Sequence, residues 1–128
     1  MITKISEGVK ISVETFYQPD YSNPVAHEYM FAYRITIENN NSFTLKLRNR
    51  YWLITDSNGE KREVEGEGVV GQQPILQFGE SFQYVSGCNL HTEVGKMEGY
   101  YVMENLHKRS TFQVAIPPFV LLAPAKLN

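Results

Sequence analysis

Three glycines with the spacing of a phosphate-binding loop lie near the middle of this 128-residue sequence. Gly66, Gly68 and Gly71 form a G-x-G-x-x-G pattern, which in dinucleotide-binding folds brings backbone N–H groups close to a pyrophosphate at the start of a helix. A predicted strand precedes the pattern, but the two valines after Gly68, and then Pro74, disfavour the helix that should follow. The sequence therefore argues against a dinucleotide-binding fold.

A second kind of anion binding is open to the same loop, because glycine-rich turns can aim N–H groups at an anion without a helix. The candidate site for pyrophosphate, a nucleotide or a divalent metal comprises Gly66, Gly68, Gly71, Lys61 and Arg62. Three glutamates between positions 63 and 67 oppose it, since carboxylates repel a phosphate. A bend that needs positive φ explains the glycines without any ligand, and we favour that interpretation.

Arginine and tryptophan alternate on one predicted strand. The alternation over residues 45–55 places Arg48, Arg50 and Trp52 on the same face. These residue types are enriched at the centres of protein interfaces, and a basic-aromatic strand also suits single-stranded nucleic acid. A net charge of -2 disfavours the nucleic acid. The face is a candidate protein-interaction surface, and a Trp52 buried in the core between solvated arginines is an equal alternative.

Metal binding and catalysis have little support. Cys88 and His91 are spaced like half of a metal site, but zinc needs three or four ligands, and the other histidines, His27 and His107, lie far away in sequence. The sequence has no G-x-S-x-G nucleophile motif and no Cys–His pair with a supporting residue. We therefore expect a non-catalytic protein with no metal site and no cofactor, and we keep an unrecognised nucleotide hydrolase as a second alternative.

The elements that must position these residues are strands, because apolar residues recur with a period of two almost throughout. The expected strands cover about residues 9–14, 29–38, 45–55, 61–65, 82–86, 97–104, 112–116 and 119–122. Asn58-Gly59 predicts a hairpin turn, 66–80 an ordered loop, and Pro117-Pro118 a bend or a sheet edge. Seven to eight such strands predict an all-β, immunoglobulin/fibronectin-III-like antiparallel β-sandwich.

One predicted strand is apolar on both of its faces. Tyr100, Tyr101, Val102 and Met103 follow one another, so one face belongs to the core and the other must meet a second sheet, a loop or a partner. Unpaired sheet edges offer a further route to a peptide partner or a homodimer.

Length and composition indicate one globular domain over residues 1–128. The single cysteine permits no internal disulfide and agrees with a reducing, cytoplasmic compartment. The sequence has no secretory signal pattern and no apolar run near the ~20 residues of a membrane span, so we expect no association with a membrane.

The chain resembles the ApaG family over well over half of its length. The matching residues are Arg50-Tyr51-Trp52-Leu53-Ile54-Thr55-Asp56, Gly59, the run from Glu63 to Pro74, Gly79, Phe82, Tyr84, Ser86-Gly87, Leu90, Thr92, Gly95, Met97, Gly99, Tyr101, Met103, Phe112, Ile116-Pro117 and Phe119. The chain departs from the usual family residues at Tyr51, Gln72, Phe78 and Glu93, where the family has His, Glu, Pro and Pro. The departures at 51 and 72 weaken any ligand model that needs a histidine or a carboxylate there.

The resemblance implies a fibronectin-III-like fold, a bacterial cytoplasmic protein and an association with cobalt resistance and magnesium efflux. It also implies protein recognition, because family members occur fused to ubiquitin-ligase or polymerase-associated proteins. The leading hypothesis is a non-catalytic interaction domain with a protein partner of unknown identity, and a homodimer through the sheet edges is a further expectation.

Overall fold

The computed structural model describes residues 1–124, so that the last four residues of the predicted 1–128 domain lie outside the described part. The strands are β1 (Ile2–Ser6), β2 (Val9–Tyr17), β3 (Tyr29–Asn39), β4 (Leu45–Asp56), β5 (Lys61–Glu67), β6 (Ile75–Leu76), β7 (Ser81–Leu90), β8 (Val94–Asn105) and β9 (Ser110–Leu122), with short 3-10 helices η1 (Pro19–Tyr21) and η2 (Pro24–Ala26). No helix in the described part is long and apolar enough to cross a membrane.

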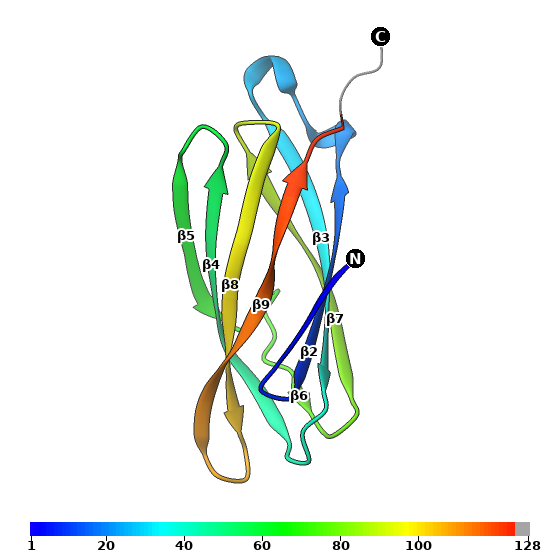
Figure 1. Ribbon diagram of the computed structural model, residues 1–128, viewed down its shortest axis with the longest axis vertical. Helices are drawn as coiled ribbons and strands as arrows, with labels where there is room; N and C mark the ends of the chain where they lie inside the picture. Colours follow the sequence, from blue (N-terminus) through cyan, green and yellow to red (C-terminus); the bar gives the residue numbers. More distant parts are fainter. Residues whose placement is uncertain (125–128) are drawn as a thin grey trace.

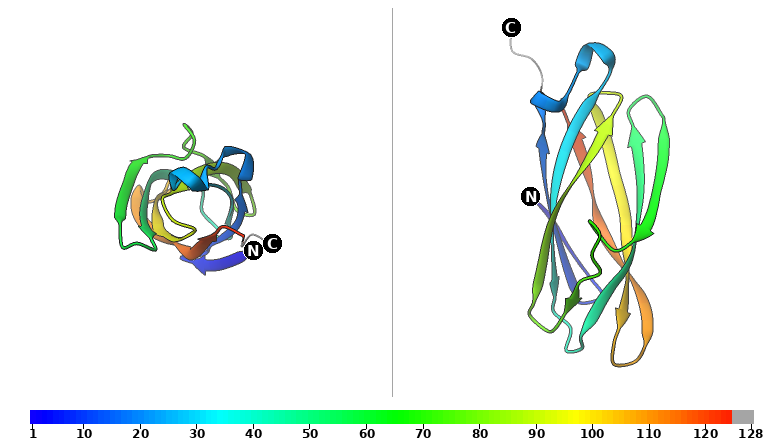
Figure 2. Two further views of the ribbon diagram at one scale, coloured as in Figure 1. Left: turned by 90° about the horizontal axis from the view of Figure 1, so that it is seen from above. Right: turned by 180° about the vertical axis from the view of Figure 1, so that it is seen from behind.

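The strands form two antiparallel sheets packed face to face, which confirms the predicted β-sandwich (Figure 1). One sheet has the order β1-β2-β3-β7, and the other has the order β5-β4-β8-β9, with the short β6 pairing with β4. Viewed along the long axis, the sheets enclose a common interior (Figure 2, left).

The core forms where the alternating apolar residues of the two sheets meet. Val9, Ile11 and Val13 of β2 are buried, as their period of two predicts. Between the sheets, the ring of Tyr33 lies 5.6 Å from that of Trp52 and 5.8 Å from that of Phe119, measured between centroids. These edge-to-face and tilted contacts are within the range in which aromatic pairs attract one another.

Residues 1–124 form nine strands where the sequence predicts seven to eight. β1 and the two-residue β6 were not predicted, and β9 runs through Pro117-Pro118 as a single strand. The register between β8 and β9 shifts opposite these prolines, between Met97 and Gly99. β9 is also the last strand of its sheet, so the prolines lie at a sheet edge, as one of the two predicted alternatives has it. The expected separation into two strands is wrong, because the register shift accommodates the prolines within β9.

A bulge in β4 reverses which of its residues face the core. Leu45 and Leu47 are buried, but after a register shift between Leu47 and Asn49 the buried residues are Trp52 and Ile54. An extra residue in one strand moves every later side chain to the opposite face. The uninterrupted alternation predicted for 45–55 is therefore wrong, and this decides the position of Trp52.

The two sides of the sandwich differ. On one side β9 contacts β1 and β2 of the facing sheet, which closes that side. On the other side lie β5 and β7, each the last strand of its sheet.

Candidate functional site

A cleft of about 330 Å³ lies between β5 and β7, on the open side of the sandwich. Trp52, Val64 and Met97 give it an apolar part, and Arg50 and Arg62 give it positive charge. The inner face of β5 presents Arg62, Val64 and Gly66 because these alternate residues pair with inward-facing residues of β4. The structure thus brings together residues from both sites that the sequence predicted separately.

Arg50 lies at the glycine end of this cleft. Its Nη1 donates to the carbonyl oxygens of Glu67 and Gly68, each at 3.1 Å. A Cβ on Gly66 would lie 2.7 Å from the same nitrogen, so glycine at that position leaves room for the guanidinium. None of the ion pairs among residues 1–124 includes Arg50. The cleft therefore contains a half-buried cation that forms no ion pair with a carboxylate of the described chain.

The charge of Arg50 reaches a group of buried tyrosines. Burial raises the pKa of Tyr33, Tyr84 and Tyr101, and the nearby Arg50 charge offsets part of that rise in each case. The hydroxyls of Tyr84 and Tyr101 share a hydrogen bond between the two sheets. These hydroxyls stay protonated and neutral, so they do not pair with the arginine as phenolates.

Arg62 lies at the other end of the cleft and bridges β5 to β7. Its guanidinium donates to the carbonyl oxygen of Asn89 and, at 3.4 Å, to the sulfur of Cys88. Burial raises the pKa of the Cys88 thiol, and the hydrogen bond and charge of Arg62 act in the opposite direction. Like Arg50, Arg62 belongs to none of the ion pairs in the described part of the chain.

The predicted face of Arg48, Arg50 and Trp52 is not one exposed surface. Trp52 is only 2% exposed and lies in the core, because the β4 bulge turns it inward. Arg48 is exposed and pairs with Glu104 at 3.2 Å. The alternative interpretation, a buried Trp52 between arginines, is the one that the structure supports.

The glycine loop is a tight turn. Gly68 and Gly71 have φ angles of 62° and 79°, in the region that glycine adopts without strain. The N–H groups of Gly68, Val69 and Gln72 donate to carbonyl oxygens of the chain itself, at 2.8 to 2.9 Å. These three amides are therefore not available to an anion, and the favoured explanation of the pattern as a bend agrees with the geometry.

The predicted basic partners of the loop lie elsewhere. Lys61 pairs with Thr55 at one end of β5, whereas Gly66 pairs with Arg50 near the other end. Five residues of strand separate Lys61 from Gly66, which is about 17 Å. The structure does not bring Lys61 or Arg62 to the glycine loop, and the arginine beside that loop is Arg50.

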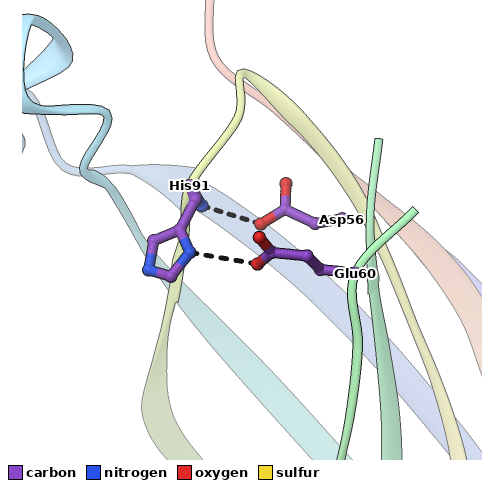
Figure 3. A group of neighbouring side chains, drawn as sticks. All are labelled: Asp56, Glu60 and His91. Atoms are coloured by element: carbon purple, nitrogen blue, oxygen red, sulfur yellow. Dashed lines mark hydrogen bonds and ion pairs between the residues drawn. The ribbon is translucent and has the colours of Figure 1, made fainter. Parts of the chain in front are cut away.

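Cys88 and His91, whose spacing resembles half of a metal site, do not form a unit, because Cys88 bonds with Arg62 while His91 lies among acidic groups (Figure 3). His91 Nδ1 is 3.2 Å from Glu60 Oε2, and the backbone N–H of His91 donates to Asp56 Oδ2 at 2.7 Å. The three side chains hold potential ligand atoms within 4.8 Å of one another. The sequence analysis missed this cluster, since only the pairing of the sheets brings residue 91 to the hairpin turn.

The outer face of β7 continues into a shallow apolar depression of about 470 Å³. Ala32 and Gly87 pair across β3 and β7 there, and Tyr21, Met30 and Val85 lie around them. A Cβ on Gly87 would lie 2.8 Å from the Met30 methyl group, so the Met30 side chain rests over the glycine. Apolar surface thus borders the open edge of β7 on its outer side.

The two faces of 100–103 differ as expected. Tyr101 and Met103 are fully buried, while Tyr100 and Val102 are half-buried on the outer face. Tyr100 stacks on Tyr51 with ring centroids 5.0 Å apart. A neighbouring side chain therefore covers part of the second apolar face.

Comparison with known proteins identifies relatives over almost the whole chain. The family model for the ApaG domain matches residues 19–105. The ApaG protein of Brucella anthropi is 50% identical and that of Brucella canis 45% identical, each over 97% of this chain and 95% of the relative. The crystal structure of the ApaA protein from Bordetella pertussis superposes with a TM-score of 0.87 at 41% identity, covering 92% of this chain and 95% of that one.

Proposed function

The chain belongs to the ApaG domain family, and from this premise we propose that it is a non-catalytic binding domain that receives an extended segment of a partner protein as an added strand beside β7. The observation that carries the proposal is the edge of β7. This strand has ten residues, no charged side chain, no proline and no register shift against β3. Such an edge is a template for another strand.

The other three sheet edges carry protection against strand addition. Five of the seven residues of β5 are charged. β9 contains Pro117-Pro118, and the five-residue β1 contains Lys4. Short length, charge and proline are the features with which proteins prevent pairing at their edges. Because β7 lacks all of them, its accessible edge is the one suited to binding.

The backbone of β7 has hydrogen-bonding groups that point away from β3. In an antiparallel pair, alternate residues direct N–H and C=O to opposite sides. The Asn89 carbonyl accepts from Arg62 on the side away from β3, so Asn89 belongs to the outward set. Counting back by two places Gly87, Val85 and Gln83 in the same set. An added strand would satisfy these groups from Gln83 to Gly87, as in other domains that bind a peptide by strand addition, while the Asn89 carbonyl already accepts from Arg62.

An added strand would also complete the sandwich. Val64, on the inner face of β5, pairs with the buried Trp52 yet is itself 36% exposed. The facing sheet therefore leaves the inner side of Val64 partly uncovered. A segment beside β7 would cover Val64 and the cleft.

The side chains around that position favour an alternating segment. Side chains that point inward would lie near Arg50 and Arg62, which favours Asp or Glu. Side chains that point outward would lie beside Val85 and the apolar depression, which favours apolar residues. The partner chemistry is thus an extended segment in which acidic and apolar residues alternate.

Two matched lysine substitutions test this proposal. Val85 on β7 is 56% exposed and Val120 on the protected β9 is 55% exposed, so lysine fits either site without a buried charge. A library of random decapeptides is selected against the original protein, Val85→Lys and Val120→Lys. We expect peptides with acidic-apolar alternation from the original and from Val120→Lys, with at least about tenfold weaker binding to Val85→Lys, since edge lysines oppose strand addition.

Further outcomes separate the parts of the proposal. Arg62→Gln should weaken the preference for acidic residues while selection still yields apolar alternation. Peptides that bind Val85→Lys and the original equally would contradict binding at β7, as would a library without enriched peptides. Sedimentation of the original protein tests the predicted homodimer. If the original protein is a dimer and Val85→Lys is a monomer, a second copy of the chain, rather than another protein, pairs with β7.

The other functional expectations stay predictions. These are ligand binding at the glycine loop, nucleotide hydrolysis, a cytoplasmic location and the association with cobalt resistance and magnesium efflux. The loop geometry favours none of them over strand addition, because its amides and glycines serve the turn itself.

A further inference from the structure

A cluster of nitrogen and oxygen donors lies at the end of the cleft next to Arg62, outside the strand-binding position. Asp56 ends β4, Glu60 lies just before β5, and His91 follows β7 (Figure 3). The cluster therefore joins the β4–β5 hairpin of one sheet to the end of a strand in the other.

The separation of the donors suits a small divalent ion. Zn²⁺ binds imidazole nitrogen and carboxylate oxygen at about 2.0–2.2 Å in tetrahedral geometry, which places neighbouring ligand atoms about 3.3–3.5 Å apart. His91 Nδ1 and Glu60 Oε2 are 3.2 Å apart. Asp56 adds a third donor, with all three groups within 4.8 Å.

The surroundings orient Asp56 and leave space at the cluster. Asp56 is 7% exposed, and its two oxygens accept hydrogen bonds from the His91 N–H and the Thr92 hydroxyl. Hydrogen bonds of this kind fix the orientation of metal-binding carboxylates. A cavity of about 80 Å³ adjoins the three side chains, enough for an ion with a water molecule.

Two cationic side chains, Arg62 and Lys61, line the same cavity, and an ion can bind only if their charges point away from it. Arg62 points toward β7, where Cys88 and Asn89 hold its guanidinium. Lys61 is exposed, so its ammonium group can extend into solvent. The hydrogen bonds of Arg62 thus direct its charge toward β7, and the flexible Lys61 is the cation that an incoming ion must displace.

We propose that Asp56, Glu60 and His91 bind one Zn²⁺ ion, with water as the fourth ligand. The ion replaces the His91–Glu60 contact and ties the β4–β5 hairpin to the end of β7. Because the ligands come from distant parts of the sequence, the folded chain binds the ion more tightly than the unfolded chain, and Zn²⁺ raises the stability of the fold. A site with one imidazole and low coordination number favours Zn²⁺ over Mg²⁺, which prefers octahedral oxygen ligands.

Calorimetric titration with zinc chloride tests the site, using protein freed of any affinity tag and of bound metal. His91→Ala and Glu60→Gln each remove a ligand, while His107→Ala removes an exposed histidine in the distant β8–β9 turn. Asp56 is left unchanged because its carboxylate holds residues 91 and 92 in place. We expect one ion per chain in the original protein and in His107→Ala, and a loss of affinity of at least about 100-fold in the other two variants.

Amide spectra of each variant check that it is folded and locate the ion. Zinc should shift the signals of residues 56–61 and 90–92 and raise the melting temperature, and magnesium at the same concentration should do neither. Absence of saturable zinc binding would overturn the proposal, as would binding that persists in both His91→Ala and Glu60→Gln or disappears in His107→Ala. Peptide selection on Val85→Lys is independent of zinc, so the two proposals can fail separately.

Discussion

Individual residues explain why the glycine pattern resembles a ligand motif. Gly68 needs a positive φ and has no space for a side chain, because a Cβ would lie 2.1 Å from the Gln72 carbonyl oxygen. Gly71 needs only the positive φ, and Gly66 only the space for Arg50. The sequence predicted a bend here, but the contact of Gly66 with Arg50 depends on the strand register and could not be read from it.

Alanine substitutions should separate these requirements. Gly71→Ala should reduce the free energy of unfolding by about 1–2 kcal/mol, the cost of a left-handed conformation in a residue with a Cβ. Gly68→Ala should cost more, because the backbone must also move away from the Gln72 carbonyl. Urea denaturation of both variants measures the difference, and equal losses of stability would contradict the geometry of the turn.

The positions of most strands were predictable from the sequence. Which of their residues face the core, and which strands lie at the sheet edges, was not always predictable. The period of two identified these strands, because buried side chains alternate with less buried ones throughout β3 and over residues 9–14 of β2. It failed within β4, where the bulge after Leu47 reverses the faces and places Trp52 in the core. A bulge leaves no clear mark in a single sequence, since Arg48 and Asn49 are acceptable on either face.

The contact between β7 and β8 predicts a dependence of stability on pH. Burial raises the pKa of Tyr84 and Tyr101 above the value of about 10 in the unfolded chain. Below about pH 10 both forms of the chain keep these protons, and the stabilisation is complete. As the pH rises further, the unfolded chain loses protons that the folded chain retains, so stability falls by about 1.4 kcal/mol per pH unit for each tyrosine.

Urea midpoints measured between about pH 9 and pH 11.5 check this dependence. The double variant Tyr84→Phe, Tyr101→Phe removes both partners of the buried hydrogen bond and should show a flatter decline. An equal decline in both proteins would mean that other groups cause the alkaline loss of stability.

At the scale of the whole molecule, the fold was predictable, whereas the candidate site forms only when the strands pair and the two sheets pack together. Composition and periodicity predicted the β-sandwich, and the fold class is confirmed. Which strands end each sheet could not be predicted, because β7 becomes an edge only when it pairs with β3 alone. The same holds for the cleft, where Arg50 and Arg62 face β7 from the other sheet. Arg50, Trp52 and Arg62 were thus singled out by residue type, but the structure brings them together in one cleft instead of two separate sites.

Amide hydrogen exchange in the presence of the tightest selected decapeptide tests the central claim most directly. The outward-facing amides of β7 are those of Gln83, Val85, Gly87 and Asn89. Strand addition predicts that the exchange of these amides slows strongly on saturation with the peptide, while the amides that already bond with β3 change little. If the peptide binds and these four amides exchange at their original rates, the account of β7 as the binding edge is wrong.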